Sequence, residues 1–472
     1  MKQRKIRIKK IAIENLKNVS KGEVVLDYNN RRKSNILGIY GQNGSGKTAL
    51  IDAIKLLKLC LTGSVIPEDV VDFITVDEKY SRLNYEFELI NCDGVYDIYY
   101  EFSLEKDFMA SEDGKTEKTI PVIACEKLSY SYKGNNGEKL RKRVVFDTNT
   151  DEIFLPKAKY DFLVGDELKV FNELFAAKII ARRERRSFIF SEMFSKVIKK
   201  DNDYKRNRKS GKEYDEICYL MDQLVMFGSS ELFIIGTENS GTLTFDVLLI
   251  NYRIKCNEYN SCGKFGVIMD EEFSVPESIF HAIEVIIGNM NIVLQQLVPG
   301  LSLVIKRIAD RYDKNNEKQV QFELFSRRNE RQIPLRYESE GIKKIISILS
   351  LLISVYNDDS VTIAIDELDS GIFEYLLGEI LKIMQEKGKG QLIFTSHNLR
   401  PLETLDKESI IFTTTNPFNR YIRMQKLKFN NNLRDTYFRS LIIEDQKEIL
   451  YDPTNNSEIA FAFREAGDFS ED

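Results

Sequence analysis

The opening stretch of the chain interleaves apolar and polar residues in the manner of β-strands before its pattern turns helical. Isoleucines mark the buried face of the first predicted strand, with one slip in the period of two, at Ile6, Ile8, Ile11 and Ile13. A second strand is expected over residues 22–27 and a third, almost wholly apolar, over residues 36–40. Residues 49–61 then follow a helical period and end near Gly63, which suits a helix C-terminus.

The middle of the chain changes from strand patterns to helical ones. A β-hairpin is predicted over residues 83–104, and strand patterns continue over residues 122–148. From about residue 167 the pattern becomes helical and then basic. A further helix is expected over residues 276–297, with proline at its start, and a second hairpin over residues 301–325. The pattern predicts a β-rich lobe followed by helices.

A length of 472 residues is too great for one compact core, so two or three lobes are expected. We predict an N-terminal lobe over residues 1–165, a helical and basic insertion over residues 166–270, and a C-terminal lobe over residues 271–472. No membrane span and no secretory signal is evident, and the six cysteines are too scattered for a zinc or disulfide framework. A reducing, cytoplasmic location without membrane contact is expected.

A glycine-rich motif connects the third predicted strand to the helix that follows it. It is a complete phosphate-binding loop, and it reads Gly41-Gln42-Asn43-Gly44-Ser45-Gly46-Lys47-Thr48. Glycines allow backbone N–H groups to surround a phosphate, and the N-terminus of the helix adds a positive field. Lys47 would then contact the β- and γ-phosphates of ATP, and Thr48 would ligate Mg²⁺. The alternative is a glycine-rich turn without a ligand.

A second apolar strand, over residues 361–365, ends in two carboxylates. Its apolar continuity is typical of a central parallel strand that is covered on both faces. Asp366 at its end is a candidate ligand for Mg²⁺, and Glu367 is a candidate to polarise an attacking water. The alternative for this pair is a simple helix cap.

Three further motifs contain candidate residues for binding a nucleotide. Ser339 and Gly341 precede a strongly apolar helix over residues 342–355, where a helix N-terminus can bind an anion. Asp369 comes just after the carboxylate pair, and His397 ends another apolar strand. Taken singly, the first could be an ordinary helix cap and the histidine a structural residue.

Together, in this order, these motifs resemble the ABC-type ATPase motor with its Walker A, signature, Walker B, D-loop and switch histidine. The basic first strand followed by Glu14-Asn15-Leu16-Lys17-Asn18 resembles the start of RecF- and SMC-type ATPases. The signature form and the Asp-Glu-Leu-Asp-Ser and Thr-Ser-His-Asn segments resemble compact prokaryotic ATPases of the OLD-like group. Many of those act in antiphage defence, as in the PARIS, Septu and abortive-infection systems.

The resemblance implies an α/β fold, in which a mixed β lobe joins a parallel phosphate-loop sheet with flanking helices and carries a helical, basic insertion. It implies a head-to-tail homodimer, or a higher homo-oligomer, with two ATPs and Mg²⁺ between the copies. One subunit's loop would face the partner's Ser339 and Gly341, with Asp369 across the interface and His397 at the γ-phosphate. The chain departs from the family because no convincing Gln-loop appears between Leu61 and the basic segment.

Four functions remain open. The first is an ATP-hydrolysing dimeric switch that scaffolds or controls a separate effector protein in antiphage defence. The second is a RecF-like DNA-binding ATPase in repair, the third a non-hydrolysing ATP-dependent clamp, and the fourth a transporter motor. The atypical signature and the long insertion weigh against the motor.

A cluster of basic residues bears on the choice between the first two. It lies between residues 182 and 212 and comprises Arg182, Arg183, Arg185, Arg186, Lys196, Lys199, Lys200, Lys205, Arg206, Arg208, Lys209 and Lys212. This basic segment is either a solvated helix face or a patch that follows nucleic-acid phosphates. A loop is expected over residues 201–212, which contain almost no apolar residues.

Overall fold

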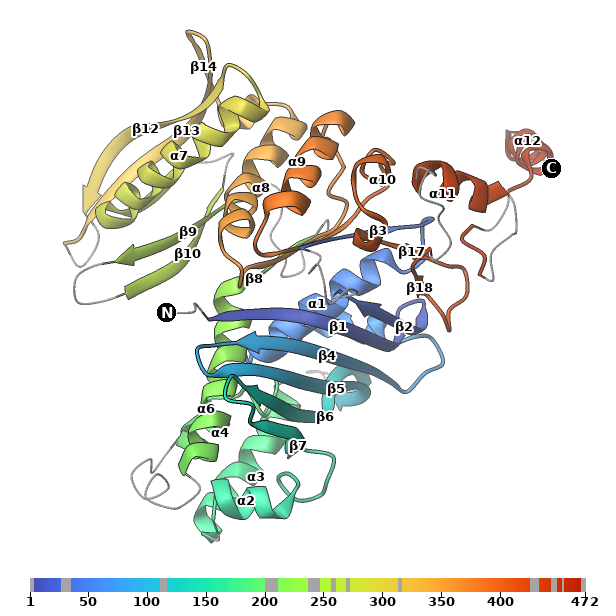
Figure 1. Ribbon diagram of the computed structural model, residues 1–472. Helices are drawn as coiled ribbons and strands as arrows, with labels where there is room; N and C mark the ends of the chain where they lie inside the picture. Colours follow the sequence, from blue (N-terminus) through green and yellow to red (C-terminus); the bar gives the residue numbers. More distant parts are fainter. Residues whose placement is uncertain are drawn as a thin grey trace.

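The computed structural model describes residues 4–26, 35–110, 117–165, 167–199, 211–236, 247–255, 260–268, 272–312, 316–424, 433–442, 448–451 and 454–467. Two six-stranded sheets dominate the fold, and helix α1 (Lys47–Leu61) lies between them (Figure 1). The predicted α/β fold, with a mixed β lobe and a parallel sheet, is confirmed.

The first sheet is antiparallel throughout and has the order β2-β1-β4-β5-β6-β7. Its strands are β1 (Lys5–Leu16), β2 (Val19–Val25), β4 (Tyr80–Ile90), β5 (Gly94–Ala110), β6 (Glu117–Gly134) and β7 (Lys139–Asp147). The slip expected in the first strand is confirmed, because a register shift falls between Ile8 and Lys10. The shift lets isoleucines on both sides of it stay in the core.

The second sheet has the order β18-β17-β3-β16-β15-β8, and only β18 runs antiparallel to its neighbour. Its strands are β3 (Ile36–Tyr40), β8 (Leu232–Ile235), β15 (Thr362–Ile365), β16 (Gln391–Thr395), β17 (Ile410–Thr413) and β18 (Tyr421–Ile422). Strands from both ends of the sequence are therefore neighbours. The carboxyl ends of β3, β15 and β16 meet at one edge, where open α/β sheets bind ligands.

Both faces of the second sheet are covered, which explains the apolar strands. Leu37 and Ile39 of β3 face the core that contains α1 and the first sheet. Ile36 and Tyr40 face a second core on the opposite side, which contains α8 (Glu340–Asn357) and α9 (Glu374–Lys387). Successive side chains of a strand point to opposite faces, so an apolar run fills both cores.

The other elements surround these two sheets. The remaining helices are α2 (Lys157–Leu163), α3 (Leu168–Arg183), α4 (Glu192–Lys199), α6 (Gly211–Met226), α7 (Glu277–Leu297), α10 (Pro401–Thr404), α11 (Leu433–Ile442) and α12 (Asn456–Gly467). Short helical turns are η1 (Glu68–Phe73), η2 (Phe227–Glu231), η3 (Leu335–Tyr337) and η4 (Lys407–Ser409). A small antiparallel sheet beside α7 contains β11 (Phe273–Pro276), β12 (Leu301–Tyr312), β13 (Lys318–Arg328) and β14 (Arg331–Pro334). A separate hairpin contains β9 (Val247–Lys255) and β10 (Asn260–Ile268).

Several expectations need correction or stay open. In the part of the chain that the structure describes, α7 is long and apolar enough to cross a membrane by length and composition, contrary to the sequence expectation. One such helix is weak evidence of a membrane span; α7 buries Phe280, Ile283 and Leu294 in the second core, and 28% of its apolar window is buried in all. The loop expected over residues 201–212 lies outside the described residues except for its last two, which begin α6. The boundaries at residues 165 and 270 stay predictions.

Candidate nucleotide-binding site

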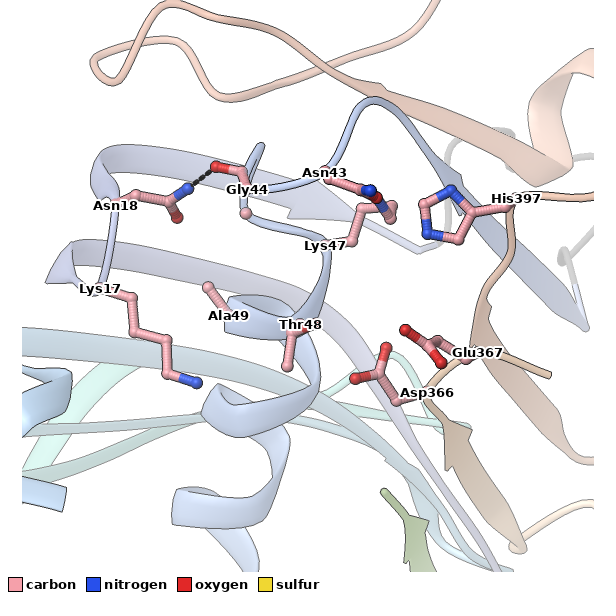
Figure 2. Close-up of a pocket in the computed structure, with 11 residues that line it drawn as sticks. Lys17, Asn18, Asn43, Gly44, Lys47, Thr48, Ala49, Asp366, Glu367 and His397 are labelled. Carbon is pink, nitrogen blue, oxygen red and sulfur yellow. Dashed lines mark hydrogen bonds between the residues drawn. The ribbon is translucent and has the colours of Figure 1, made fainter. Parts of the chain in front are cut away.

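A cavity of about 240 Å³ opens at the carboxyl edge of the second sheet. Residues from four separate parts of the sequence line it, and Figure 2 shows them: Lys17, Asn18, Asn43, Gly44, Gly46, Lys47, Thr48, Ala49, Asp366, Glu367 and His397. The phosphate loop therefore lies beside the carboxylate pair and the histidine.

The loop has the backbone that its glycines permit. Gly44 has φ 73° and Gly46 has φ 94°, left-handed values that side chains rarely tolerate. At Gly41 a Cβ atom would come within 1.7 Å of Thr413 Oγ1, so the loop packs directly on β17. Ser45 Oγ donates to the Gln42 carbonyl at 2.6 Å and fixes the turn from inside.

Lys47 is buried at the start of α1 and points back into the loop. Its Nζ donates to the carbonyls of Gly41 and Gln42, at 2.9 Å each. Burial lowers the pKa of Lys47, while the nearby carboxylates of Asp366 and Glu367 raise it. The amine is thus partly desolvated before any phosphate arrives, and a bound phosphate would replace weak carbonyl acceptors with an anionic one. Thr48, the next residue, is exposed toward the cavity.

The two carboxylates differ in exposure. Asp366 is 3% exposed, and the hydroxyl of Thr395 donates to its Oδ1 at 2.5 Å. The same hydroxyl accepts a hydrogen bond from the backbone N–H of Glu367 at 2.7 Å. The Glu367 side chain is exposed, and Figure 2 shows both carboxylates directed at the space below His397. Thr395, on the neighbouring strand β16, therefore holds both members of the pair, a role that sequence reasoning missed.

Asp369 contacts the histidine segment of its own chain. Its Oδ2 accepts hydrogen bonds from the backbone N–H groups of His397 at 3.0 Å and Asn398 at 2.9 Å. The expected position of Asp369 across a dimer interface stays a prediction. The His397 ring lies beside Lys47 in Figure 2, at the mouth of the cavity.

Ser339 and Gly341 do not line the cavity of their own chain. Ser339 is the N-cap residue of α8, is exposed, and makes no side-chain capping hydrogen bond. Gly341 packs against the loop after Asp369, because a Cβ atom at Gly341 would lie 2.1 Å from the carbonyl oxygen of Gly371. The N-terminus of α8 is thus exposed on the surface next to the loop that follows Asp369.

Two supports of the phosphate loop were not expected from the sequence. Lys17 and Asn18, in the turn between β1 and β2, form one wall, and the Asn18 amide donates to the Gly44 carbonyl. Behind the loop, the Tyr421 hydroxyl donates to the Gly46 carbonyl at 2.8 Å, and Arg420 donates to the Asn18 carbonyl. The motif Glu14–Asn18 was the sequence signal for the wall formed by Lys17 and Asn18. No local sequence pattern indicated the support from Tyr421 and Arg420.

The basic segment is largely neutralised where the structure describes it. Six of its residues pair with carboxylates: Arg182 with Asp107, Arg185 with Glu68, Arg186 with Glu184, Lys196 with Glu192, Lys199 with Asp222, and Lys212 with Glu138. Residues 200–210 lie outside the described part of the chain. The described portion fits a solvated, ion-paired surface better than a phosphate-following patch.

Two protein-family models match the chain. Residues 10–233 match one described as an AAA domain, and residues 282–403 match one described as an AAA domain, putative AbiEii toxin, Type IV TA system. No curated protein matches.

Solved structures with similar folds include the SMC head domain from Thermotoga maritima, at 15% identity with a TM-score of 0.37, covering 89% of this chain and 100% of that one. The recombination mediator RecF bound to ATPrS is 14% identical with a TM-score of 0.37, covering 89% and 99%. The Smc head domain of Pyrococcus furiosus bound to ScpA is 12% identical with a TM-score of 0.39, covering 89% and 96%. The first family match contains the phosphate loop and the second contains the carboxylate pair, so each half of the candidate site falls within a stretch similar to an AAA domain.

Proposed function

We propose that the chain binds and hydrolyses ATP as a dimeric switch that controls a separate effector protein, with antiphage defence as its setting. One observation carries the proposal: the phosphate loop, Asp366, Glu367 and His397 line a single cavity although they come from distant parts of the sequence. A structural loop or an isolated helix cap would not need this convergence. The described parts of the chain thus bring together a loop that could bind phosphates and a carboxylate that could activate a water for attack on the γ-phosphate.

The residues present fit a magnesium ion. Thr48 and Asp366 both line the cavity, and Figure 2 shows their side chains next to one another; a hydroxyl and a carboxylate are ligands that Mg²⁺ accepts alongside phosphate oxygens. When bound there, the ion would neutralise the β- and γ-phosphate charge. Thr395 holds the buried oxygen of Asp366, which leaves the other oxygen for the cavity.

The chain's own side chains divide the remaining work. Lys47 and the loop N–H groups would bind the phosphates, and His397, whose ring lies beside Lys47 at the mouth of the cavity, would contact the γ-phosphate. Glu367 is exposed at the cavity and can accept a proton from, or orient, the attacking water. The hydrogen bond from the Glu367 backbone N–H to the Thr395 hydroxyl fixes the backbone from which the Glu367 side chain extends.

A second copy would complete the site. The cavity is smaller than the roughly 300–1,000 Å³ of ordinary small-molecule sites, so a nucleotide would extend out of it. The exposed N-terminus of α8, with Ser339 and Gly341, is a suitable anion-binding end to cover the nucleotide of a partner subunit. ATP would then join two copies head to tail, and hydrolysis would release them.

The effector role has narrower support. The description of the second family match, a putative toxin of a toxin–antitoxin system, favours a link to an effector over a role in repair. The ion-paired state of the described basic segment also gives little support to the RecF-like alternative. If that alternative were right, binding to duplex DNA would weaken steeply with salt, with a log–log slope near −0.9 per phosphate contacted.

The test replaces Glu367, the proposed base. Glu367→Gln should still bind ATP, should accumulate as a dimer in ATP by light scattering, and should lose roughly 10²–10⁴ in turnover. Glu386→Gln, at an exposed position of α9, is the matched control and should behave like the unchanged chain. Lys47→Ala should bind no ATP.

The effector is sought with the same variants. Glu367→Gln in ATP should retain the effector from phage-infected cells, and Lys47→Ala should not. Unchanged hydrolysis in Glu367→Gln would remove that residue from the base role, and a chain that stays monomeric in ATP would refute the dimeric switch.

A further inference from the structure

A buried lysine links the N-terminal turns of α8 to the carboxylate pair of the same chain. Lys344 lies two turns or less from Ser339 on α8, and it is 4% exposed. Its Nζ donates a hydrogen bond of 2.6 Å to the backbone carbonyl of Glu367. A long, flexible ammonium side chain is seldom buried in this way without a specific acceptor.

The backbone that Lys344 holds has an uncommon conformation. Glu367 has φ 49°, in the left-handed region that non-glycine residues rarely enter. Such residues persist where their surroundings fix them, and they cluster at functional sites. Two side chains fix this one from opposite directions, because Thr395 accepts from its N–H and Lys344 donates to its carbonyl. The position of the Glu367 carboxylate thus depends on both.

Charge adds to this link. Burial lowers the pKa of Lys344 to about 8, while Asp369, Glu367 and Asp366 favour its charged form. The amine lies beside the backbone of Glu367, whose carboxylate faces the cavity. Moving it would change both a hydrogen bond and the field at the site.

A second contact joins the same two regions. A Cβ atom at Gly341 would lie 2.1 Å from the Gly371 carbonyl, so the start of α8 and the loop after Asp369 are in direct backbone contact. Asp369 in turn binds the backbone of His397. The helix that would meet a partner's ATP is thus connected at two points to the groups that would act on the chain's own ATP.

We propose that Lys344 is a positioning residue that couples the two ATP sites of the dimer. When α8 of one chain engages the nucleotide of its partner, Lys344 moves with the helix and changes the placement of Glu367 at the chain's own nucleotide. Filling one site then prepares the other for hydrolysis. This inference rests on the proposed function, because it needs an ATP-bound dimer.

The test compares two lysines that each donate to a backbone carbonyl of another element. Lys344→Met removes the link, and Lys58→Met is the matched control. Lys58 lies on α1 and donates to the Leu232 carbonyl at 2.8 Å, and burial likewise lowers its pKa to about 8. Turnover is measured against ATP concentration at pH 7.5, together with ATP binding by each variant.

The unchanged chain should show a Hill coefficient well above 1 for its two coupled sites. Lys344→Met should fall to a Hill coefficient of about 1 and lose about tenfold or more in turnover, with ATP affinity changed by less than about threefold. Lys344→Arg, which keeps the charge and a donor, should restore part of the cooperativity. Lys58→Met should keep it in full.

Cooperative hydrolysis that is unchanged in Lys344→Met, or lost equally in Lys58→Met, would overturn the inference and leave the proposed function intact. Absence of hydrolysis in the unchanged chain would remove the proposed function, and this inference with it. Should Lys344→Met fail to fold, Lys344→Arg decides: its displaced donor should lower the Hill coefficient, and full cooperativity would refute the coupling.

Discussion

Thr395 offers the sharpest test of how the carboxylate pair is held, because one hydroxyl serves two partners. Thr395→Val keeps the shape of the side chain, which is 1% exposed, and removes only that hydroxyl. The Asp366 carboxylate then loses a donor at 2.5 Å, and the N–H of Glu367 loses its acceptor at 2.7 Å. A buried group left unpaired costs about 1–3 kcal/mol, and more if it is charged. The free energy of unfolding should therefore fall by about 2–5 kcal/mol.

Urea unfolding of Thr395→Val and Thr395→Ser provides the measurement. Serine keeps the hydroxyl and loses one methyl group, so it should cost only about 1 kcal/mol. Mg²⁺ with a non-hydrolysable nucleotide should reduce the difference in the free energy of unfolding between the two variants, because the ion would bind the Asp366 carboxylate in both. Turnover should fall in Thr395→Val and not in Thr395→Ser. Equal stability of the two variants would show that the hydroxyl does not hold the pair.

Two further outcomes follow from the same structure. Gly341→Ala should abolish ATP-dependent dimerisation, measured by light scattering, because the new Cβ atom would lie 2.1 Å from the Gly371 carbonyl oxygen. ATP binding by the Gly341→Ala monomer should stay intact. The control is Gly288→Ala on α7, where nothing lies within 4 Å of the new Cβ atom, and it should leave both dimerisation and ATP binding unchanged. Lys58, with its pKa lowered from 10.5 to about 8, binds fewer protons folded than unfolded between those values, so its contribution to stability rises with pH. The free energy of unfolding of the unchanged chain relative to Lys58→Met should therefore increase, by up to about 3 kcal/mol, from pH 7 to pH 10.5 in urea titrations, and a decrease would contradict the assignment.

The elements that the sequence predicted well are those whose burial follows from local pattern alone. Strand β3 is apolar because it is covered on both faces, and the shift in β1 appears directly as a slip in its isoleucines. The phosphate loop is likewise local, because its glycines, Lys47 and Thr48 are adjacent in the chain. Such features need no knowledge of what packs against them.

Features that depend on neighbouring strands could not be predicted in this way. Thr395 is an unremarkable strand residue until β15 and β16 are known to be adjacent, and only that pairing brings its hydroxyl to Asp366. Strand β8 has only four residues, and its place in the second sheet follows from its pairing with β15. Lys344 interrupts an apolar helix, and its acceptor on Glu367 comes from another element.

The phosphate loop also depends on residues beyond residue 403, where the second family match ends. Thr413 leaves no room for a side chain at Gly41, and Tyr421 donates to the Gly46 carbonyl. Helix α11 covers this region from outside, where Tyr437 stacks on Phe412 with ring centroids 4.9 Å apart. These contacts tie β17, β18 and α11 to the loop geometry. The folded unit that forms the phosphate loop therefore extends past the two matched stretches, and residues of β17 and β18 support the candidate nucleotide site from behind.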